Sequence, residues 1–295
     1  MYYIFYGPLY LASLLPFAFL YLISDGLYVI SYYILGYRKK VVMNNLNIAF
    51  PEKTKKERVR IAKKFYKNFC DNIVESIKLL SMSDAMFDER VNGDFSLVDK
   101  LAGEGKNVQL HIGHQFNWEY CNLVIARNTH VIPFVGVYGP ITNKAFNKII
   151  YDIRAKYGTV MIAKPDFAKQ YRTFLTQRYV LALGADQNPV NPGIHYWMNF
   201  FSKPVAFITG PAKSAVKNNL AVVFLRSRKV KRGYYVYECT EVTSNAAAYT
   251  PEKLTIMYRD YLVKTIREEP DNYLWSHKRW KYEYKDECKK NWIDN

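Results

Sequence analysis

A histidine and a glutamate lie close together where an apolar run of the chain, residues 107–112, ends. His114 is followed after four residues by Glu119, in the sequence Gly113-His-Gln-Phe-Asn-Trp-Glu. A carboxylate one turn into the following helix can hold the Nδ1 proton of such a histidine, which leaves Nε2 free to accept a proton from a hydroxyl group. The pair therefore has the chemistry of a general base. A helix-capping histidine beside a solvated glutamate would give the same pattern.

Strand-like and helical segments alternate along most of the chain, and this order predicts the fold that positions His114. The strand-like runs are residues 107–112, 131–138, 159–162, 179–184, 221–227 and 233–238. The expected helices are residues 117–127, 143–157, 166–176, 210–218 and 251–267. Short strands separated by helices of about 10 to 15 residues predict an α/β fold, with a mixed, largely parallel sheet flanked by helices. Ligands bind such sheets beyond the carboxyl ends of the strands, so we expect chemistry at the turns that contain His114 and Asp186.

A long amphipathic helix is expected ahead of the sheet, at residues 58–80. Its apolar side chains recur about every four residues. They are Ile61, Phe65, Phe69, Ile73 and Ile77. Thr54 stands where it can cap this helix, and many of the remaining positions are Lys or Arg. The pattern predicts a helix with a basic outer face.

The N-terminus is strongly apolar. Met1–Ser24 carries no charged side chain, and Asp25 is the only charged residue before Arg38, Lys39 and Lys40. About 20 apolar residues can cross a bilayer, and positive residues that flank a span stay on the cytoplasmic side. We therefore expect membrane attachment, either as a crossing or as a helix that lies along the membrane surface or packs on the protein body. No Lys or Arg precedes the apolar run, which disfavours a cleaved signal peptide.

The composition is that of a folded, basic protein. Of its 295 residues, 49% are hydrophobic and 16% aromatic, which excludes a disordered or collagen-like chain. The formal net charge of +16 favours an anionic partner, such as a nucleic acid, an anionic lipid or an acidic carrier protein. The four cysteines form no Cys-x-x-Cys pair, and no group of Cys, His, Asp and Glu has the spacing of a metal site. We therefore predict reduced thiols and no metal.

Five segments, spread over nearly the whole chain, form a recognisable set. They are the apolar N-terminus; Met43-Asn-Asn-Leu-Asn-Ile-Ala-Phe-Pro51; His114-x4-Glu119; Leu183-Gly-Ala-Asp-Gln187 with Phe200-Phe-Ser-Lys-Pro204; and Pro270-Asp-Asn-Tyr-Leu-Trp-Ser-His-Lys-Arg-Trp-Lys281. The set resembles the late acyltransferases of lipid A biosynthesis, the lauroyl and myristoyl transferases of the bacterial inner membrane. This resemblance implies a glycerolipid acyltransferase-like fold and acyl transfer from an acyl carrier protein thioester to a hydroxyl group of a membrane lipid. It also implies that His114 and Glu119 are the catalytic pair; we expect no cofactor.

Four further residues are expected to support the site: Arg154, Asp186, Gln187 and Lys164. Asp186 and Gln187 match an Asp-Gln turn of the resembled family, and Asp186 either orients His114, binds the acceptor headgroup or simply caps a turn. Arg154 matches a family arginine, and its two-pronged guanidinium suits a phosphate or an oxyanion, although a solvated helix arginine is the alternative. Lys164 is assigned to a basic rim. Backbone N–H groups at the start of the helix after His114 are a further expected source of oxyanion donors.

These expectations divide the chain into a membrane-anchoring segment, residues 1–36, and an acyltransferase catalytic domain, residues 37–295, facing the cytoplasm at a bacterial inner membrane. The expected partners are an acyl carrier protein as donor, an anionic lipid or glycolipid as acceptor, and the membrane, with no nucleic acid. A lysophospholipid, an aminolipid or a mannoside remains open as acceptor, and acyl-CoA as donor. A membrane-anchored nucleic-acid-binding protein is the alternative from another class, which the scattered basic residues disfavour.

Overall fold

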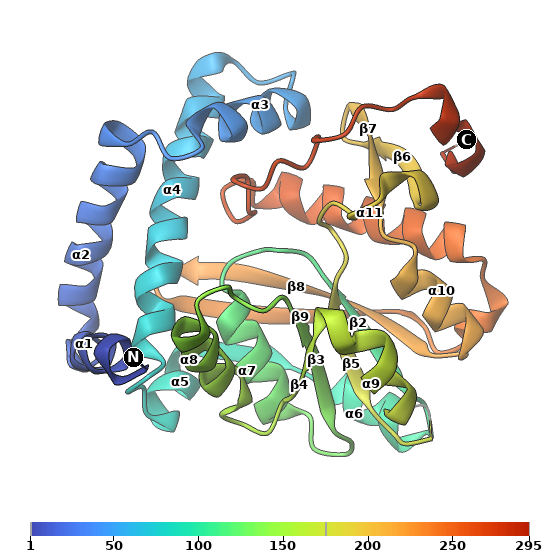
Figure 1. Cartoon of the computed structure of the whole chain (residues 1–295), viewed down its shortest axis with the longest axis horizontal. Helices are drawn as coiled ribbons and strands as arrows, with labels where there is room; N and C mark the ends of the chain where they lie inside the picture. Colours follow the sequence, from blue (N-terminus) through green and yellow to red (C-terminus); the bar gives the residue numbers. More distant parts are fainter. Residues whose placement is uncertain (1, 175, 295) are drawn as a thin grey trace.

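The strand-like runs of the sequence join into one sheet in the computed structural model, which describes residues 2–174 and 176–294 (Figure 1). The seven strands are β1 (Val91–Asp94), β2 (Val108–Ile112), β3 (Phe134–Tyr138), β4 (Val160–Ala163), β5 (Val180–Gly184), β8 (Ala221–Lys231) and β9 (Tyr234–Thr243). Their order is β1-β9-β8-β2-β5-β3-β4, and within the described part of this sheet only β8 and β9 pair antiparallel. The prediction of an α/β fold with a largely parallel sheet is therefore confirmed.

The register of the two central strands brings distant turns together. Strand β2 lies between β5 and β8, and Ile112 at its end is paired with Gly184 at the end of β5. Because β2 and β5 are parallel, the turns that follow them leave the sheet at the same edge. His114 and Asp186, each two residues beyond this pair, are thereby placed next to each other.

Helices connect and cover the strands. They are α5 (Asp84–Arg90), α6 (Ser96–Gly103), α7 (Trp118–Asn128), α8 (Lys144–Ala155), α9 (Phe167–Phe174), α10 (Gly210–Lys217) and α11 (Pro251–Glu268), with short 3-10 turns at Lys164–Asp166, Pro192–Ile194, Ala246–Ala248 and Asp286–Asn291. A separate antiparallel hairpin, β6 (Tyr196–Phe200) and β7 (Lys203–Phe207), was not expected from the sequence. Its turn contains Phe201 in a left-handed conformation, with φ of 56°, which no local residue pattern indicates.

The N-terminal part is helical and lies against the body of the protein. It consists of α1 (Tyr2–Leu14), α2 (Phe17–Val29), a π-helical turn η1 (Ile30–Ile34), α3 (Lys39–Ala49) and α4 (Lys55–Lys78). Helix α2 runs beside α4 (Figure 1). Residues 17–34 are long and apolar enough to cross a membrane by length and composition. Thr54 caps α4 through a capping box with Glu57, which confirms the predicted cap. The helix begins at Lys55, earlier than the expected range of 58–80, because the first turn follows the cap directly.

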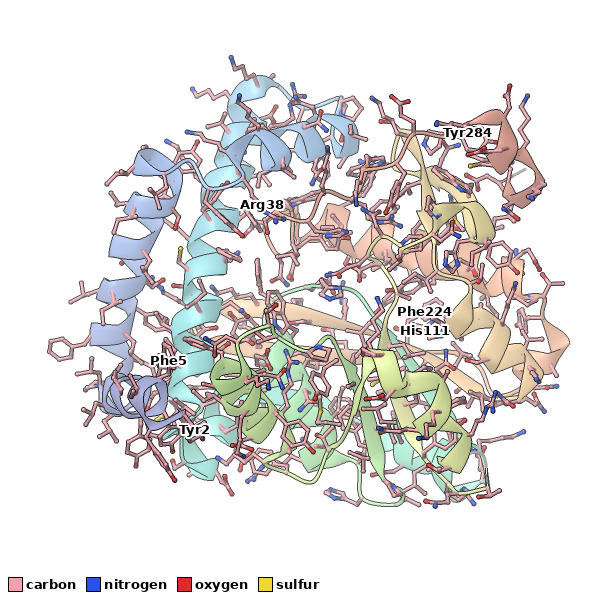
Figure 2. All side chains as sticks on the ribbon, viewed as in Figure 1. Tyr2, Phe5, Arg38, His111, Phe224 and Tyr284 are labelled. Carbon is pink, nitrogen blue, oxygen red and sulfur yellow. The ribbon has the colours of Figure 1, made fainter. Side chains whose placement is uncertain are left out.

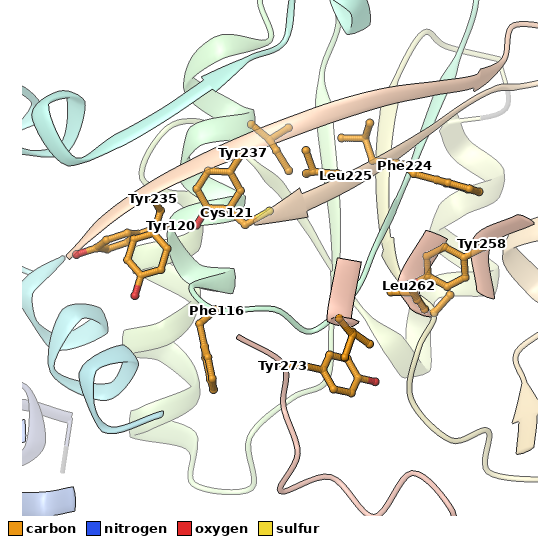
Figure 3. Packing of buried hydrophobic residues seen from close by; sticks show 14 of the residues in the cluster. Phe116, Tyr120, Cys121, Phe224, Leu225, Tyr235, Tyr237, Tyr258, Leu262 and Tyr273 are labelled. Carbon is orange, nitrogen blue, oxygen red and sulfur yellow. The ribbon is translucent and has the colours of Figure 1, made fainter. Parts of the chain in front are cut away.

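Aromatic side chains fill the core beneath the turn that holds His114. Figure 3 shows Tyr120 beside Tyr235, with Tyr237 and Phe116 in the same cluster, and all four are buried. Buried phenol groups need hydrogen-bond partners. The Tyr237 hydroxyl donates to the carbonyl oxygen of Asn117 at 2.5 Å. The core therefore fixes the backbone just beyond His114.

One buried carboxylate joins four elements near this turn. Glu75 of α4 accepts hydrogen bonds from Tyr21 of α2 at 3.2 Å, from Tyr235 of β9 at 2.8 Å, and from the Asn117 side chain at 3.1 Å. Burial raises the pKa of Glu75, while the charge of Lys229 lowers it. Because Asn117 is also the N-cap of α7, the junction at Glu75 connects the apolar helix α2 to the helix that carries Glu119.

Candidate active site

The His114 side chain is held by Asp186. The Nδ1 atom of His114 lies 2.5 Å from Oδ1 of Asp186, and the His114 backbone N–H donates to Oδ2 at 2.9 Å. Asp186 is fully buried, whereas 28% of the His114 side chain is exposed. Two contacts to one carboxylate fix both the ring and its backbone. Nε2 is then the ring nitrogen that remains for proton transfer.

The charges of this pair stabilise each other. Burial lowers the pKa of His114, but the charge and hydrogen bond of Asp186 raise it, and the net shift is upward. Burial raises the pKa of Asp186, but His114 and Arg279 lower it to about 2. Asp186 is therefore ionised at neutral pH, and it favours the protonated ring that a general base becomes when it accepts a proton.

Glu119 is bound to Arg154 and does not hold His114 as the sequence spacing suggested. The Arg154 Nε donates to Oε2 of Glu119 at 2.8 Å and Nη2 donates to Oε1 at 2.6 Å. A two-pronged arginine–carboxylate pair of this kind is strong and directional. Arg154 comes from α8, and Asp186 comes from the turn after β5, the strand beside β2. Both partners are distant in sequence, so the spacing from His114 to Glu119 could not reveal either.

His114 and Arg154 line the same cavity, which has a volume of about 230 Å³. His114 reaches it from the turn after β2, and Arg154 reaches it from the last turn of α8. Apolar and small residues supply most of the remaining wall. They are Ile112, Gly113, Trp118, Cys121, Ile125, Phe134, Gly136, Val137, Gly139, Met161, Ala182 and Gly184, with Asn122 and Tyr138 as polar members. A proton acceptor and a cation thus face one largely apolar space, an arrangement that suits attack on a carbonyl group attached to a hydrocarbon chain.

Gly184 is a site residue that the sequence alone did not single out. A Cβ atom built on Gly184 would lie 2.9 Å from Cε1 of His114, closer than such atoms normally approach. The absence of a side chain there leaves room for the imidazole ring. The only signal in the sequence is a glycine at the end of a strand, and its meaning depends on the pairing of β5 with β2.

The backbone amides expected to bind an oxyanion are already engaged. The Oδ1 atom of Asn117 accepts from the N–H groups of Glu119 at 3.0 Å and of Tyr120 at 3.2 Å. This is an ordinary N-cap, and it satisfies the amides that the helix start would otherwise leave free. The expectation is corrected for these two groups, and Arg154 is the positively charged donor that lines the cavity.

Gln187 and Lys164 are not brought to the cavity. Gln187 is half-buried directly after Asp186, and Lys164 is exposed in the 3-10 turn after β4. Neither is among the described residues that line the cavity beside His114. Across residues 2–174 and 176–294, no group of three or more His, Cys, Asp and Glu side chains is placed to hold a metal ion.

The segment after α11 fastens the turn that holds His114. The N–H of Leu274 donates to the His114 carbonyl oxygen at 3.1 Å, and the N–H of Phe116 donates to the Asn272 carbonyl oxygen at 3.3 Å. Farther along, the buried Arg279 donates to the Ala206 carbonyl oxygen at 2.9 Å. The segment thus holds the backbone of the turn that contains His114, and the charge of its Arg279 contributes to the low pKa of Asp186.

Comparison with known proteins gave one family. A family described as bacterial lipid A biosynthesis acyltransferase matches residues 1–282. A comparison with curated proteins found no match.

Proposed function

The chain belongs to the bacterial lipid A biosynthesis acyltransferase family, and we propose that it transfers a fatty acyl chain from an acyl carrier protein thioester to a hydroxyl group of a lipid A precursor or a related membrane glycolipid. Membership of this family makes it an acyltransferase. The observation that carries the finer proposal is the 2.5 Å contact of His114 with Asp186 beside a largely apolar cavity that Arg154 also lines.

His114 acts as the general base. Its Nε2 accepts the proton of the lipid hydroxyl while the hydroxyl oxygen attacks the thioester carbonyl carbon. The tetrahedral intermediate then collapses, the carbon–sulfur bond breaks, and the carrier thiolate leaves with the proton from His114. Asp186 keeps the ring in the tautomer with a proton on Nδ1 and stabilises the imidazolium that forms. A base of this kind contributes a factor of about 100 to 10,000 in rate.

Arg154 stabilises the oxyanion of the tetrahedral intermediate. Glu119 takes Nε and one N–H of Nη2, so the remaining guanidinium N–H groups are left for a substrate oxygen. Preorganised donors of this kind are effective because they need not reorient during the reaction. Glu119 is therefore a positioning residue that acts through Arg154, whereas the sequence suggested that it acts on His114.

Charge and free thiols support the proposed donor and compartment. Acyl carrier proteins are acidic, so the net charge of +16 should accelerate the encounter with such a donor, and salt should slow it. The basic residues Arg38, Lys39 and Lys40 directly after the apolar segment support a catalytic domain on the cytoplasmic side of the inner membrane. The cysteines Cys70, Cys121, Cys239 and Cys288 are all free thiols, which is compatible with a reducing compartment.

The test is turnover of a labelled acyl carrier protein thioester with purified lipid acceptors. The His114→Ala variant should lose a factor of about 100 to 10,000 in turnover. His130→Ala is the matched control, because His130 is exposed in the loop after α7 and does not line the cavity. If His114→Ala has normal turnover, His114 is not the general base and this part of the proposal is wrong.

The acceptor is identified separately by mass spectrometry of total lipids from cells with and without the active protein. A new acyl group on a lipid A precursor supports the proposal. An acyl group on a lysophospholipid, an aminolipid or a mannoside would agree with the proposed reaction but would show that the proposed acceptor is wrong. Equal turnover with acyl-CoA, independent of ionic strength, would overturn the carrier protein as donor.

A further inference from the structure

The outer face of the N-terminal helices is apolar and uncovered. Eight large side chains there are each at least 57% exposed: Tyr3, Ile4, Leu11, Phe19, Leu22, Tyr33, Ile34 and Leu35. Side chains project away from the body along α1 and α2 (Figure 2). Soluble proteins rarely expose a continuous apolar surface of this kind unless it meets a membrane or a partner.

The inner face of the same helices is tied to the body by buried charges. The Arg232 Nη2 donates to Asp71 of α4 at 2.7 Å and to Asp25 of α2 at 2.8 Å. The ammonium group of Lys78, a residue that is 5% exposed, donates to the Ser13 carbonyl oxygen at the end of α1 at 2.8 Å. Moving α1 and α2 away from the body would separate Arg232 from Asp25 and the buried Lys78 ammonium from the Ser13 carbonyl oxygen. It would also take from the buried Asp71 carboxylate the hydroxyl of Ser24 in α2, which donates to it at 2.7 Å, and losing partners is unfavourable for buried charges. Only the outer face of these helices is therefore available to lipid.

A basic groove adjoins this apolar face. It has a volume of about 380 Å³ and lies between α4 and the end of α2. Its lining residues are Lys56, Val59, Arg60, Lys63, Lys64 and Lys67 of α4, with Tyr28 of α2. None of the ion pairs among the described residues involves these five cations. The groove therefore carries a strong positive charge, which the nearby carboxylates Glu57 and Asp25 offset only in part, at Arg60 and Lys67.

The cations that line the groove are close enough along α4 to repel one another. Arg60 and Lys64 are four residues apart on α4, as are Lys63 and Lys67, and like charges at that spacing destabilise a helix. The Lys67 ammonium lies 5.4 Å from the centre of the Tyr28 ring, and the Lys63 ammonium lies 5.5 Å from that of Tyr33. The cations thus sit at aromatic rings of the kind that occupy the boundary between lipid tails and headgroups.

We propose that the protein binds an anionic bilayer without crossing it, with the outer face of α1, α2 and η1 in the acyl layer and the basic groove over lipid phosphate groups. The apolar face and the groove meet at Tyr33 of η1, which is 57% exposed and whose ring centre lies 5.5 Å from the Lys63 ammonium, so a single bilayer surface can contact both. An acidic carrier protein would match the charge of the groove but would leave the adjoining apolar face in water. The inference goes beyond the proposed reaction, and its test measures binding and not turnover.

The groove is tested by co-sedimentation of the full-length protein with phosphatidylcholine vesicles and with vesicles that also contain 30% phosphatidylglycerol. The test variant is Arg60→Gln/Lys64→Gln/Lys67→Gln. Each cation near an anionic surface is worth about a factor of five in binding, so this variant should lose on the order of 100-fold in affinity for the anionic vesicles. Without lipid it should be at least as thermally stable as the parent protein, because repulsion between cations is removed.

The matched control is Lys217→Gln/Lys253→Gln/Lys290→Gln. It removes the same charge from exposed positions on α10, α11 and the C-terminal turn, outside the groove. The control should bind anionic vesicles within about fivefold of the parent protein. An equal loss in both variants would assign the effect to net charge and overturn the groove. A groove variant that keeps its vesicle affinity but loses affinity for acyl carrier protein would make the groove a donor site, and the proposal would be wrong.

The absence of a crossing is tested with Tyr3→Cys, because a crossing by residues 17–34 would separate Tyr3 from the body. The variant is added to vesicles that enclose a membrane-impermeant maleimide, and modification is compared with that of the parent protein. No added modification is expected, while the same variant in detergent should react. Modification by the enclosed reagent would show that α1 reaches the far side and would overturn the proposal.

Discussion

Replacing Asp186 by Asn should separate the charge of this residue from its shape. The substitution keeps one side-chain oxygen that can accept from Nδ1 of His114, but it removes the negative charge and replaces the oxygen that accepts from the His114 backbone N–H with an amide nitrogen. The pKa of Asp186 is lowered from 3.8 to about 2, and this difference corresponds to about 2 kcal/mol in favour of the ionised form. If the same interaction stabilises the imidazolium during the reaction, we expect kcat/KM to fall by at least about 30-fold.

The pH dependence of Asp186→Asn gives a second, independent result. A general base works only when it is neutral, so kcat/KM of the parent protein should fall as the pH drops through the raised pKa of His114. Without the charge of Asp186, burial and Arg154 remain, and both lower that pKa. The acidic limb of the profile should therefore move to lower pH while the plateau falls.

The assay is steady-state turnover of labelled acyl carrier protein with a lipid acceptor, measured across pH. Circular dichroism should be unchanged, so that a folding defect is not mistaken for lost chemistry. The double variant His114→Ala/Asp186→Asn should be little slower than His114→Ala alone, because residues that share one function are not additive. An acidic limb that stays in place with a plateau that is nearly normal would refute the role given to Asp186.

Three further substitutions test the remaining contacts. Gly184→Ala should lower kcat at least about tenfold in steady-state kinetics, because the new methyl group would lie 2.9 Å from the His114 ring and displace it, and an unchanged kcat would contradict this. Glu119→Gln should lower turnover by about 10- to 100-fold, because Arg154 would be held less firmly, and the acidic limb of the pH profile should not move. If the limb moves, Glu119 acts on His114 and the role given to it here is wrong. Lys78→Met should lower the free energy of unfolding in urea by about 1–3 kcal/mol, because carbonyl groups at the end of α1 lose a buried donor, and an unchanged midpoint would contradict that role.

Local patterns in the sequence were sufficient for the long elements of the fold. Thr54 and the four-residue apolar repeat predicted α4, and the alternation of apolar runs with helical segments predicted most of the parallel sheet. Short elements were missed. Strand β1 is only Val91-Asn-Gly-Asp94, which has no apolar pattern of its own and forms because it pairs with β9.

Pairings between distant residues were the part that the sequence could not supply. The turns of His114 and Asp186 were both identified as strand ends, but 72 residues separate them, and only the register of β2 with β5 brings them into contact. Glu119 was assigned to His114 on its spacing in the sequence and on the resemblance to the acyltransferase family. Its carboxylate instead meets Arg154, whose position depends on how α8 packs beside α7.

The hydrogen bonds that meet at Glu75 have a practical consequence for inhibitor discovery, which needs a soluble form of the enzyme. Deleting the N-terminal helices would remove the Tyr21 hydroxyl and leave the buried Glu75 carboxylate with one donor fewer, directly beside Asn117 at the start of α7. Compounds screened against such a truncated chain would meet an altered binding site. Replacing outward-facing side chains such as Phe19 and Leu22 with polar ones would remove the apolar outer face of the N-terminal helices. The cavity beside His114 would then keep the structure that it has in the full-length enzyme.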